Sequence, residues 1–177
     1  MPRNRRPQDR EEKRAEIVDA ATALFVEAGF DGTPLSRIAQ SAGVTPNTIY
    51  WYFSDKDELL VAALTEITAT ALTRFAELEV TSPQERLTWV VTELERYHRL
   101  VDTVHARAAV SAPIDEWHNG FHAMADALVA EEELRHVGVA EERIAARTKV
   151  VVFAVEGMLT HPQSAADKAA IVDALFT

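Results

Sequence analysis

The side chains best suited to binding chemistry lie in one short run of the chain. Between residues 45 and 52 it offers hydroxyl, amide and aromatic groups and no acidic side chain: Thr45, Pro46, Asn47, Thr48, Tyr50, Trp51 and Tyr52. Short polar side chains can reach base edges in a major groove, and aromatic rings and hydroxyls can pack on sugar and phosphate. The run therefore predicts noncovalent binding to nucleic acid.

Two short helices around a tight turn are expected to hold this run. Gly43 supplies a positive φ at the turn at little steric cost. Thr45 is a suitable N-cap for the second helix, and Pro46 fits its first position, where a missing N–H is harmless. Leu35, Ile38 and Ala42 are expected on the buried face of the first helix, and Val44 and Ile49 are expected to fill the angle between the two helices. This pattern is typical of a helix-turn-helix.

The alternative for the same segment is an ordinary corner between two helices, with Tyr50, Trp51 and Phe53 in a core. On that interpretation Phe53 is mostly core. Packing gives no reason, however, for Asn47 and Thr48 to share a helix with an aromatic run. The helix-turn-helix is therefore the favoured interpretation.

The rest of the chain also has helical periodicity. Helices are expected over about 10–28, 55–79, 82–105, 117–138, 141–161 and 165–176. No segment alternates with period two for long enough to form a sheet. The predicted fold is all-α, with a three-helix head over residues 1–54 and a helical body over residues 55–177. The two parts are expected to share the helix that begins near Asp55.

Composition limits the classes of protein that fit. The chain has 177 residues and no cysteine, which excludes disulfides, thiolate zinc sites, iron-sulfur clusters and a cysteine nucleophile. Its net charge is −10, yet residues 1–14 carry +3 and residues 61–177 carry −8, so phosphate binding is expected at one end only. The longest apolar run, Val150–Val155, is far shorter than a bilayer span. We expect no membrane segment and a cytoplasmic protein.

The N-terminal third, about residues 10–64, resembles the TetR (tetracycline-repressor) family of bacterial transcriptional regulators. The resemblance rests on gapless runs at fixed spacing: residues 28–30, Thr33, 38–39, 42–44, 49–53 and 56–60. It implies a homodimeric repressor, without catalytic activity or cofactor, that binds a palindromic operator in double-stranded DNA. It also implies release of the operator by a small-molecule effector and dimerisation through the C-terminal helices, and the aromatic and methionine side chains of the body favour an apolar effector.

The resemblance assigns DNA-contact roles position by position. Residues 45–48 would face bases or nearby phosphates, with Tyr50 and Trp51 on the DNA backbone. Outside the second helix the implied DNA-binding residues are Thr33, Ser36, Arg37 and Lys56. Pro34 departs from the family, which more often has a hydroxyl residue there, so one phosphate contact is in doubt. The arm that carries Arg3, Arg5, Arg6 and Arg10 either reaches a minor groove or is a solvated tail.

The body would bind the effector and the second subunit. The run 150–155 is apolar all around its helix and needs cover from a partner. Glu156 is either paired there or exposed near the helix end. The expected walls of an effector pocket are Trp89, Tyr97, His98, His105, Trp117, Phe121, Met124 and Met158. Of His98 and His105, which share an apolar stripe, one is expected in the core and the other in the pocket.

His118 and His122 raise a separate possibility, because histidines four residues apart on a helix can chelate a metal. Asp115 or Asp126 could add a carboxylate. A zinc-protease helix is rejected, because Asn119 stands where the general base would be. A metal-binding or metal-sensing protein is the alternative function, beside a DNA-binding module whose body only docks a protein partner.

Overall fold

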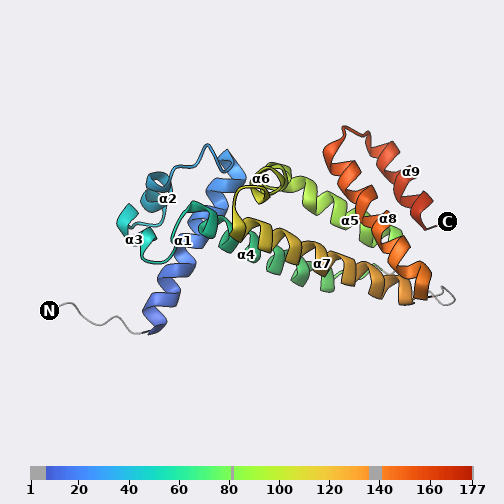
Figure 1. Cartoon of the computed structure of the whole chain (residues 1–177), viewed down its shortest axis with the longest axis horizontal. Coiled ribbons are helices and arrows are strands. Elements are labelled where there is room, and N and C mark those ends of the chain that lie inside the picture. Colours follow the sequence, from blue (N-terminus) through green and yellow to red (C-terminus); the bar gives the residue numbers. More distant parts are fainter. Residues whose placement is uncertain (1–6, 81, 136–140, 177) are drawn as a thin grey trace. The chain divides into compact units, whose positions relative to one another are not determined.

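The computed structural model describes residues 7–80, 82–135 and 141–176, and every regular element in these ranges is an α-helix (Figure 1). The helices are α1 (Pro7–Ala28), α2 (Leu35–Ser41), α3 (Pro46–Tyr50), α4 (Lys56–Ala76), α5 (Pro83–Arg96), α6 (His98–Ala108), α7 (Ala112–Arg135), α8 (Glu141–Thr160) and α9 (Ala165–Leu175). The all-α prediction is confirmed.

The chain forms two compact units. The first contains the residues up to Ala71 together with Arg99–Glu116, and the second contains Leu72–His98 and the residues from Trp117 onward. α4 and α7 each contribute residues to both units. These units are defined by contacts between residues and differ in their bounds from the head at 1–54 and the body at 55–177. That division of the chain by function stays a prediction.

The first unit is built on the buried face of α1. Its largest fully buried side chains come from α1, α2, α3, α4, α6, α7 and the segment after α3: Ile17, Phe25, Ile38, Ile49, Phe53, Leu59, Leu60, Leu100 and Ile114. α1 ends at Gly29, whose φ is 75° and whose N–H donates to the Phe25 carbonyl at 3.0 Å. Glycine adopts this conformation without strain, so the sequence-based helix end is confirmed.

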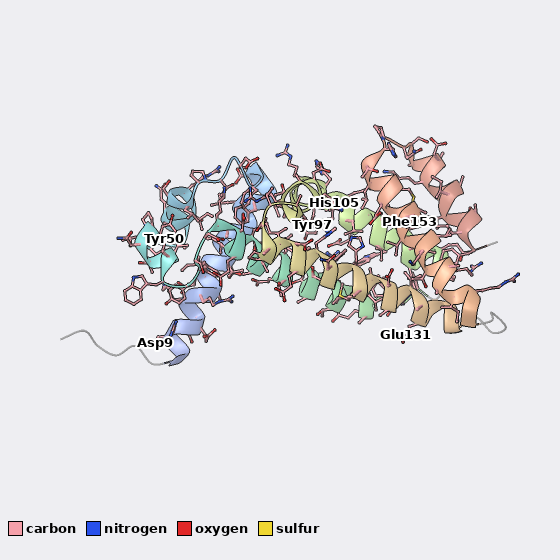
Figure 2. All side chains as sticks on the ribbon, in the orientation of Figure 1. Asp9, Tyr50, Tyr97, His105, Glu131 and Phe153 are labelled. Carbon is pink, nitrogen blue, oxygen red and sulfur yellow. The ribbon has the colours of Figure 1, made fainter. Side chains whose placement is uncertain are left out.

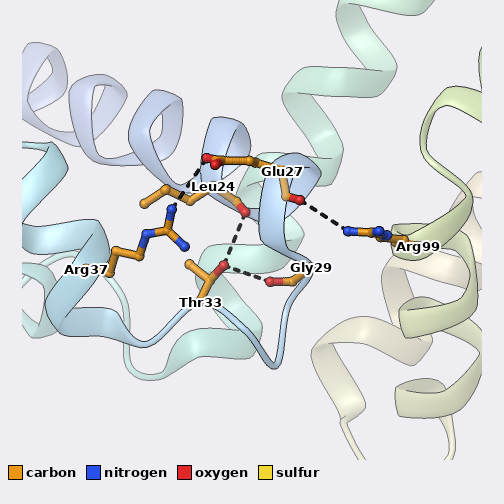
Figure 3. Close-up of polar contacts among 6 residues, drawn as sticks. All are labelled: Leu24, Glu27, Gly29, Thr33, Arg37 and Arg99. Carbon is orange, nitrogen blue, oxygen red and sulfur yellow. Dashed lines mark hydrogen bonds and ion pairs between the residues drawn. The ribbon is translucent and has the colours of Figure 1, made fainter.

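The turn between α1 and α2 is fixed by a buried hydroxyl. Thr33 is fully buried, and its Oγ1 lies 2.7 Å from the Gly29 carbonyl and 3.2 Å from the Leu24 carbonyl (Figure 3). In the same figure the Glu27 carboxylate faces Arg37, and the Glu27 carbonyl accepts from Arg99 at 3.2 Å. The hydroxyl ties the turn to the last turns of α1.

Phe30 lies beside two cations in the first unit. Lys56 Nζ is 4.0 Å from its ring centroid and donates to its carbonyl, and the Arg107 guanidinium carbon is 4.7 Å from the same centroid. Arg107 also forms a two-bond pair with Asp57, at 2.9 Å from Nε to Oδ1 and 2.6 Å from Nη2 to Oδ2. These contacts hold the first turn of α4 against Phe30 and α6.

The second unit has its own core. Leu87 and Val91 of α5 pack with Val151 and Met158 of α8 and Val172 of α9. Figure 1 shows α8 and α9 running side by side next to α5. The three helices therefore pack against one another through a shared aliphatic core.

One carboxylate joins the end of α4 to α5 within this unit. Glu93 is buried, and its two oxygens accept from Arg74 at 2.5 Å and from Arg96 at 3.1 Å. Arg74 also lies over the Trp89 ring, which contacts Phe75 at a centroid distance of 5.7 Å. A buried charge is costly without partners. The two arginines therefore allow the Glu93 carboxylate to be buried.

Two helix boundaries differ from the sequence-based expectation. The helix expected over 82–105 is broken at Tyr97, whose φ of −112° and ψ of 19° end α5 before α6 begins. Apolar periodicity continues across the break and does not reveal it. The expected helix over 117–138 begins earlier, at Ala112, and the part after residue 135 lies outside the described residues. Pro113 is accommodated in the first turn, where its missing N–H has no helical partner.

Within the described ranges, α4 alone is long and apolar enough to cross a membrane, with a mean hydropathy of 1.4 over its best window. Length and composition carry this result, and a core helix passes the same test. Four residues of α4 are in fact buried in the core: Leu59, Leu60, Ala63 and Leu64. Threonines and Glu66 interrupt the apolar residues of α4, so its sequence holds no long unbroken apolar run.

Thr33→Val should lower the free energy of unfolding by about 1–3 kcal/mol, because two carbonyls lose the same buried donor. Thr22→Val in α1 is the matched control. Thr22 Oγ1 is buried without a hydrogen-bond partner in the described part of the chain, so its removal should leave stability unchanged or raise it. Urea unfolding measures both variants; equal losses would contradict the role given to Thr33.

Asp57→Asn should destabilise the protein at neutral pH and flatten its acid unfolding. Burial alone raises the pKa of Asp57, but hydrogen bonds from Arg107 and Ser111 and the charges of Arg107 and Lys56 outweigh it and hold the pKa below its ordinary value. The carboxylate therefore stabilises the fold above about pH 4, and this contribution is lost as pH falls through the folded-state pKa.

Unfolding free energies measured from pH 7 down to about pH 2 test this. Asp102→Asn, at an exposed position of α6, is the control and should keep the wild-type pH dependence. An Asp57→Asn profile parallel to that of the wild type would contradict the prediction.

Candidate nucleic-acid interface

The turn between α2 and α3 is closed by backbone geometry. Gly43 has φ 63°, its N–H donates to the Gln40 carbonyl at 3.2 Å, and the Val44 N–H donates to the Ala39 carbonyl at 2.9 Å. This pair of bonds is the Schellman ending of α2. The positive φ predicted for Gly43 is confirmed, and the turn sets the direction in which α3 leaves.

α3 is held at its first residue and from below. Thr45 Oγ1 accepts the N–H of Thr48 at 3.3 Å and lies 3.0 Å from the Thr48 hydroxyl. Ile49 is fully buried, as are Ile38 and Ala39 of α2. The N-cap and the apolar anchor predicted from the sequence are confirmed, and the opposite face of α3 is left to solvent.

That outer face carries neutral polar and aromatic groups. Pro46, Asn47 and Tyr50 are exposed, and Trp51 is 82% exposed. Figure 2 shows Tyr50 directed away from the neighbouring helices. The corner interpretation, with Tyr50 and Trp51 in a core, is therefore wrong, whereas Phe53 is buried as expected.

α2 adds two exposed polar residues at the same end of the unit. Ser36 and Arg37 are both exposed, and Arg37 Nη2 lies 3.5 Å from a Glu27 carboxylate oxygen. An exposed pair at this distance is weak. Arg37 can therefore exchange this partner for a phosphate. Thr48 and Tyr52 are partly buried, and both stay in the predicted set.

Two residues of the predicted set face inward. The Thr33 hydroxyl is buried on carbonyls of α1 and Gly29, so this side chain cannot reach a duplex. Lys56 directs its amine to the Phe30 carbonyl and ring, and burial lowers the pKa of Lys56 although Asp31 and Asp57 act against it. We correct the assignment of Thr33, which positions the interface without forming its surface. Lys56 is only partly buried and stays in the predicted set.

The N-terminal arm lies at the edge of what can be described. Arg3, Arg5 and Arg6 fall outside the described residues. Arg10 is exposed on the first turns of α1, and the Arg14 guanidinium lies 5.1 Å from the Phe53 ring centroid. Near the start of α1, the exposed side chain of Arg10 therefore adds positive charge to the surface.

The expected pocket residues do not behave as one set. Met158 is a core residue packed against α5 and α9. His98 and His105 are both exposed, so the expectation that one of them is a core histidine is wrong. Trp117 stacks on Phe121 at 5.4 Å, and both are partly buried. Trp89, Tyr97 and Met124 are also partly buried and remain candidates for an effector site.

His118 and His122 form a cluster that the sequence shows only in part. Their Nε2 atoms are 2.9 Å apart, and His122 Nε2 lies 3.6 Å from Glu156 Oε1 on α8. The structure therefore places the Glu156 carboxylate beside His122. Of the two alternatives expected for Glu156, the structure supports the paired one.

Arg107 and Asp57 fix the first turn of α4, and sequence reasoning does not identify their pairing. They are separated by 50 residues, and no local pattern joins them. Helical periodicity describes each helix by itself. A signal for this pair could come only from knowing that α6 packs beside α4.

Comparison with known proteins agrees with this geometry. Residues 17–63 match the family model described as "Bacterial regulatory proteins, tetR family". The HTH-type transcriptional regulator AcrR of Shigella flexneri is 40% identical over 73 residues, which cover 41% of this chain and 32% of AcrR. TtgR of Pseudomonas putida is 41% identical over 66 residues, covering 37% of this chain and 31% of TtgR. The aligned segment thus spans about a third of these relatives.

The likeness in fold extends over nearly the whole chain. The crystal structure of a transcriptional regulator from a Rhodococcus species superposes with a TM-score of 0.71 at 20% identity, covering 92% of this chain and 91% of that one. At this identity the likeness concerns the fold alone. The relatives named here are regulators of transcription, and they give no support to a metal-sensing protein as the alternative.

Proposed function

This chain carries the helix-turn-helix segment of the tetR family of bacterial regulatory proteins, and from that premise we propose that it is a DNA-binding transcriptional regulator. The proposal assigns no catalytic step and no cofactor to the chain. It places the chain in the cytoplasm, where operator DNA lies.

One observation carries the proposal. α3 is buried through Ile49 and exposes a face of hydroxyl, amide and aromatic groups, with Trp51 at 82% exposure and no acidic side chain. A carboxylate on this face would repel phosphate, whereas amide and hydroxyl groups can bond to base edges. The face therefore suits a duplex better than it suits an acidic or apolar protein partner.

We assign roles to the exposed residues accordingly. Asn47, with Thr45, Pro46 and Thr48, faces the base edges of the major groove. Tyr50, Trp51 and Tyr52 pack on the sugar-phosphate backbone, and Ser36 and Arg37 bind phosphate. An amide such as Asn47 can bond to two positions of one adenine, which gives it the greatest discrimination of the group.

The regulator acts as a homodimer in this proposal. Val150 and Phe153 of α8 are 56% and 66% exposed. Large apolar side chains next to each other on one helix favour cover by a second subunit. Two heads held by such a dimer would bind an inverted repeat. A small effector bound in the body would release the operator by favouring the conformation with lower DNA affinity.

Selection of random duplexes on the purified chain, followed by sequencing, tests the function directly. We expect an enriched inverted repeat with half-sites about one helical turn apart. The selection should be made at stated salt, because phosphate contacts make affinity salt-dependent. No enrichment at low salt would reject the proposal.

Asn47→Ala and Trp51→Ala should weaken binding to the selected duplex without unfolding the protein. Loss of the Asn47 amide should cost about 1–3 kcal/mol of binding free energy, and both side chains are exposed, so stability should change by less than about 0.5 kcal/mol. Fluorescence anisotropy with a labelled duplex measures the affinity.

Val110→Ala is the matched control, because Val110 is 78% exposed and lies outside the helix-turn-helix. Its affinity should equal that of the wild type. Wild-type affinity in Asn47→Ala or Trp51→Ala would remove that residue from the interface.

Phe153→Glu should convert the dimer to a monomer, because it places a charge in the apolar contact. Sedimentation velocity across a range of protein concentrations measures the change. Val110→Glu adds the same charge at another exposed apolar position and should stay dimeric. A wild-type chain that sediments as a monomer, or a Phe153→Glu chain that sediments as a dimer, would reject α8 as the subunit contact.

A further inference from the structure

Three side chains of the second unit bring nitrogen and oxygen donors together between α7 and α8. His118 and His122 lie one turn apart on α7, and Glu156 comes from α8. The two imidazole Nε2 atoms are 2.9 Å apart, and Glu156 Oε1 is 3.6 Å from His122 Nε2. The three side chains are neither fully exposed nor fully buried. The regulator proposed above has no use for this arrangement.

The short distance between the two rings restricts their protonation. Both Nε2 atoms point at each other while the ring planes are nearly perpendicular, at 88°. One Nε2 must then carry a proton and the other must accept it, so at least one imidazole of the pair is neutral. Imidazole nitrogens beside a carboxylate are the donors that a divalent transition ion binds, and the ion would displace the proton shared by the two rings.

We propose that His118, His122 and Glu156 form a binding site for a divalent transition-metal ion of the Zn²⁺ class. Zn²⁺ binds imidazole nitrogen and carboxylate oxygen at about 2.0–2.2 Å. In tetrahedral geometry this places two donor atoms roughly 3.3 Å apart. The observed separations of 2.9 and 3.6 Å lie on either side of that value. The two imidazole rings would turn so that both Nε2 lone pairs point at the ion.

The surroundings of the cluster suit such a site. Trp117 stacks on Phe121 of the same helix. The centroids of the Phe121 and His122 rings are 6.1 Å apart, and their planes are nearly perpendicular. Aromatic neighbours limit the access of water to the ligands. Three protein ligands leave a fourth position of the ion for water or for a small molecule that donates oxygen or nitrogen. The ion would also tie α7 to α8.

The test needs no DNA, so its outcome is independent of the proposed regulatory function. The full chain is freed of metal by dialysis against a chelator and titrated with Zn²⁺ in competition with a chromophoric chelator. We expect one ion per chain. His122→Ala and Glu156→Gln should each weaken binding at least about tenfold, as loss of groups around a metal does.

His161→Ala is the matched control, because His161 is an exposed histidine just after α8. It should bind Zn²⁺ like the wild type. Wild-type affinity in His122→Ala, or no competition with the chelator by the wild-type chain, would overturn the site. Wild-type affinity in Glu156→Gln alone would overturn the three-ligand set.

A measurement on the unchanged chain covers the case in which a variant fails to fold. Co²⁺ added to the wild-type chain should give the intense visible absorption of a four- or five-coordinate ion, and Zn²⁺ should displace it. The weak spectrum of six-coordinate aqueous Co²⁺ would overturn the proposal. A bound ion should also raise the thermal unfolding midpoint, because it binds only the folded cluster.

Discussion

A helix of five residues cannot keep its shape alone in water, and this constraint governs the first unit. Helices shorter than about 12 residues are marginal even with favourable sequences, yet α3 must present its outer face in a fixed direction. The chain solves this with three local devices: the positive φ of Gly43, the Thr45 cap and the burial of Ile49. Removing any one of them leaves the exposed residues without a rigid support.

Below α3, charged side chains bond within the unit and fix the position of the first turn of α4. Lys56 and Arg107 both use Phe30, and Arg107 holds Asp57 with two hydrogen bonds. Thr33 closes the same region from the side of α1. The Thr33 hydroxyl, which the family resemblance assigned to DNA, instead fixes the turn. The resemblance identified the position as important but not the role of its side chain.

Local signals in the sequence are sufficient for the helix-turn-helix and insufficient for the body. Glycine, cap and apolar spacing act over fewer than five residues, so the roles of Gly29, Gly43, Thr45 and Ile49 follow from their immediate neighbours in the chain. Glu156 beside His122, Met158 in the core and the break at Tyr97 depend on how distant helices pack. Apolar periodicity names a buried face without naming the neighbour that buries it.

The charges of the first unit limit how its DNA affinity can arise. Among its described basic side chains, Lys56 and Arg107 are committed inside the unit, Lys13 pairs with Glu16, and Arg99 bonds to a carbonyl of α1. α3 itself has no charge. Among the described residues, the exposed arginines Arg10 and Arg37 remain for phosphate, and the N-terminal arm adds Arg3, Arg5 and Arg6. Since each neutralised phosphate adds to the salt dependence of binding, that dependence counts the arginines that contact DNA, whereas the uncharged face of α3 contributes through base edges and aromatic packing.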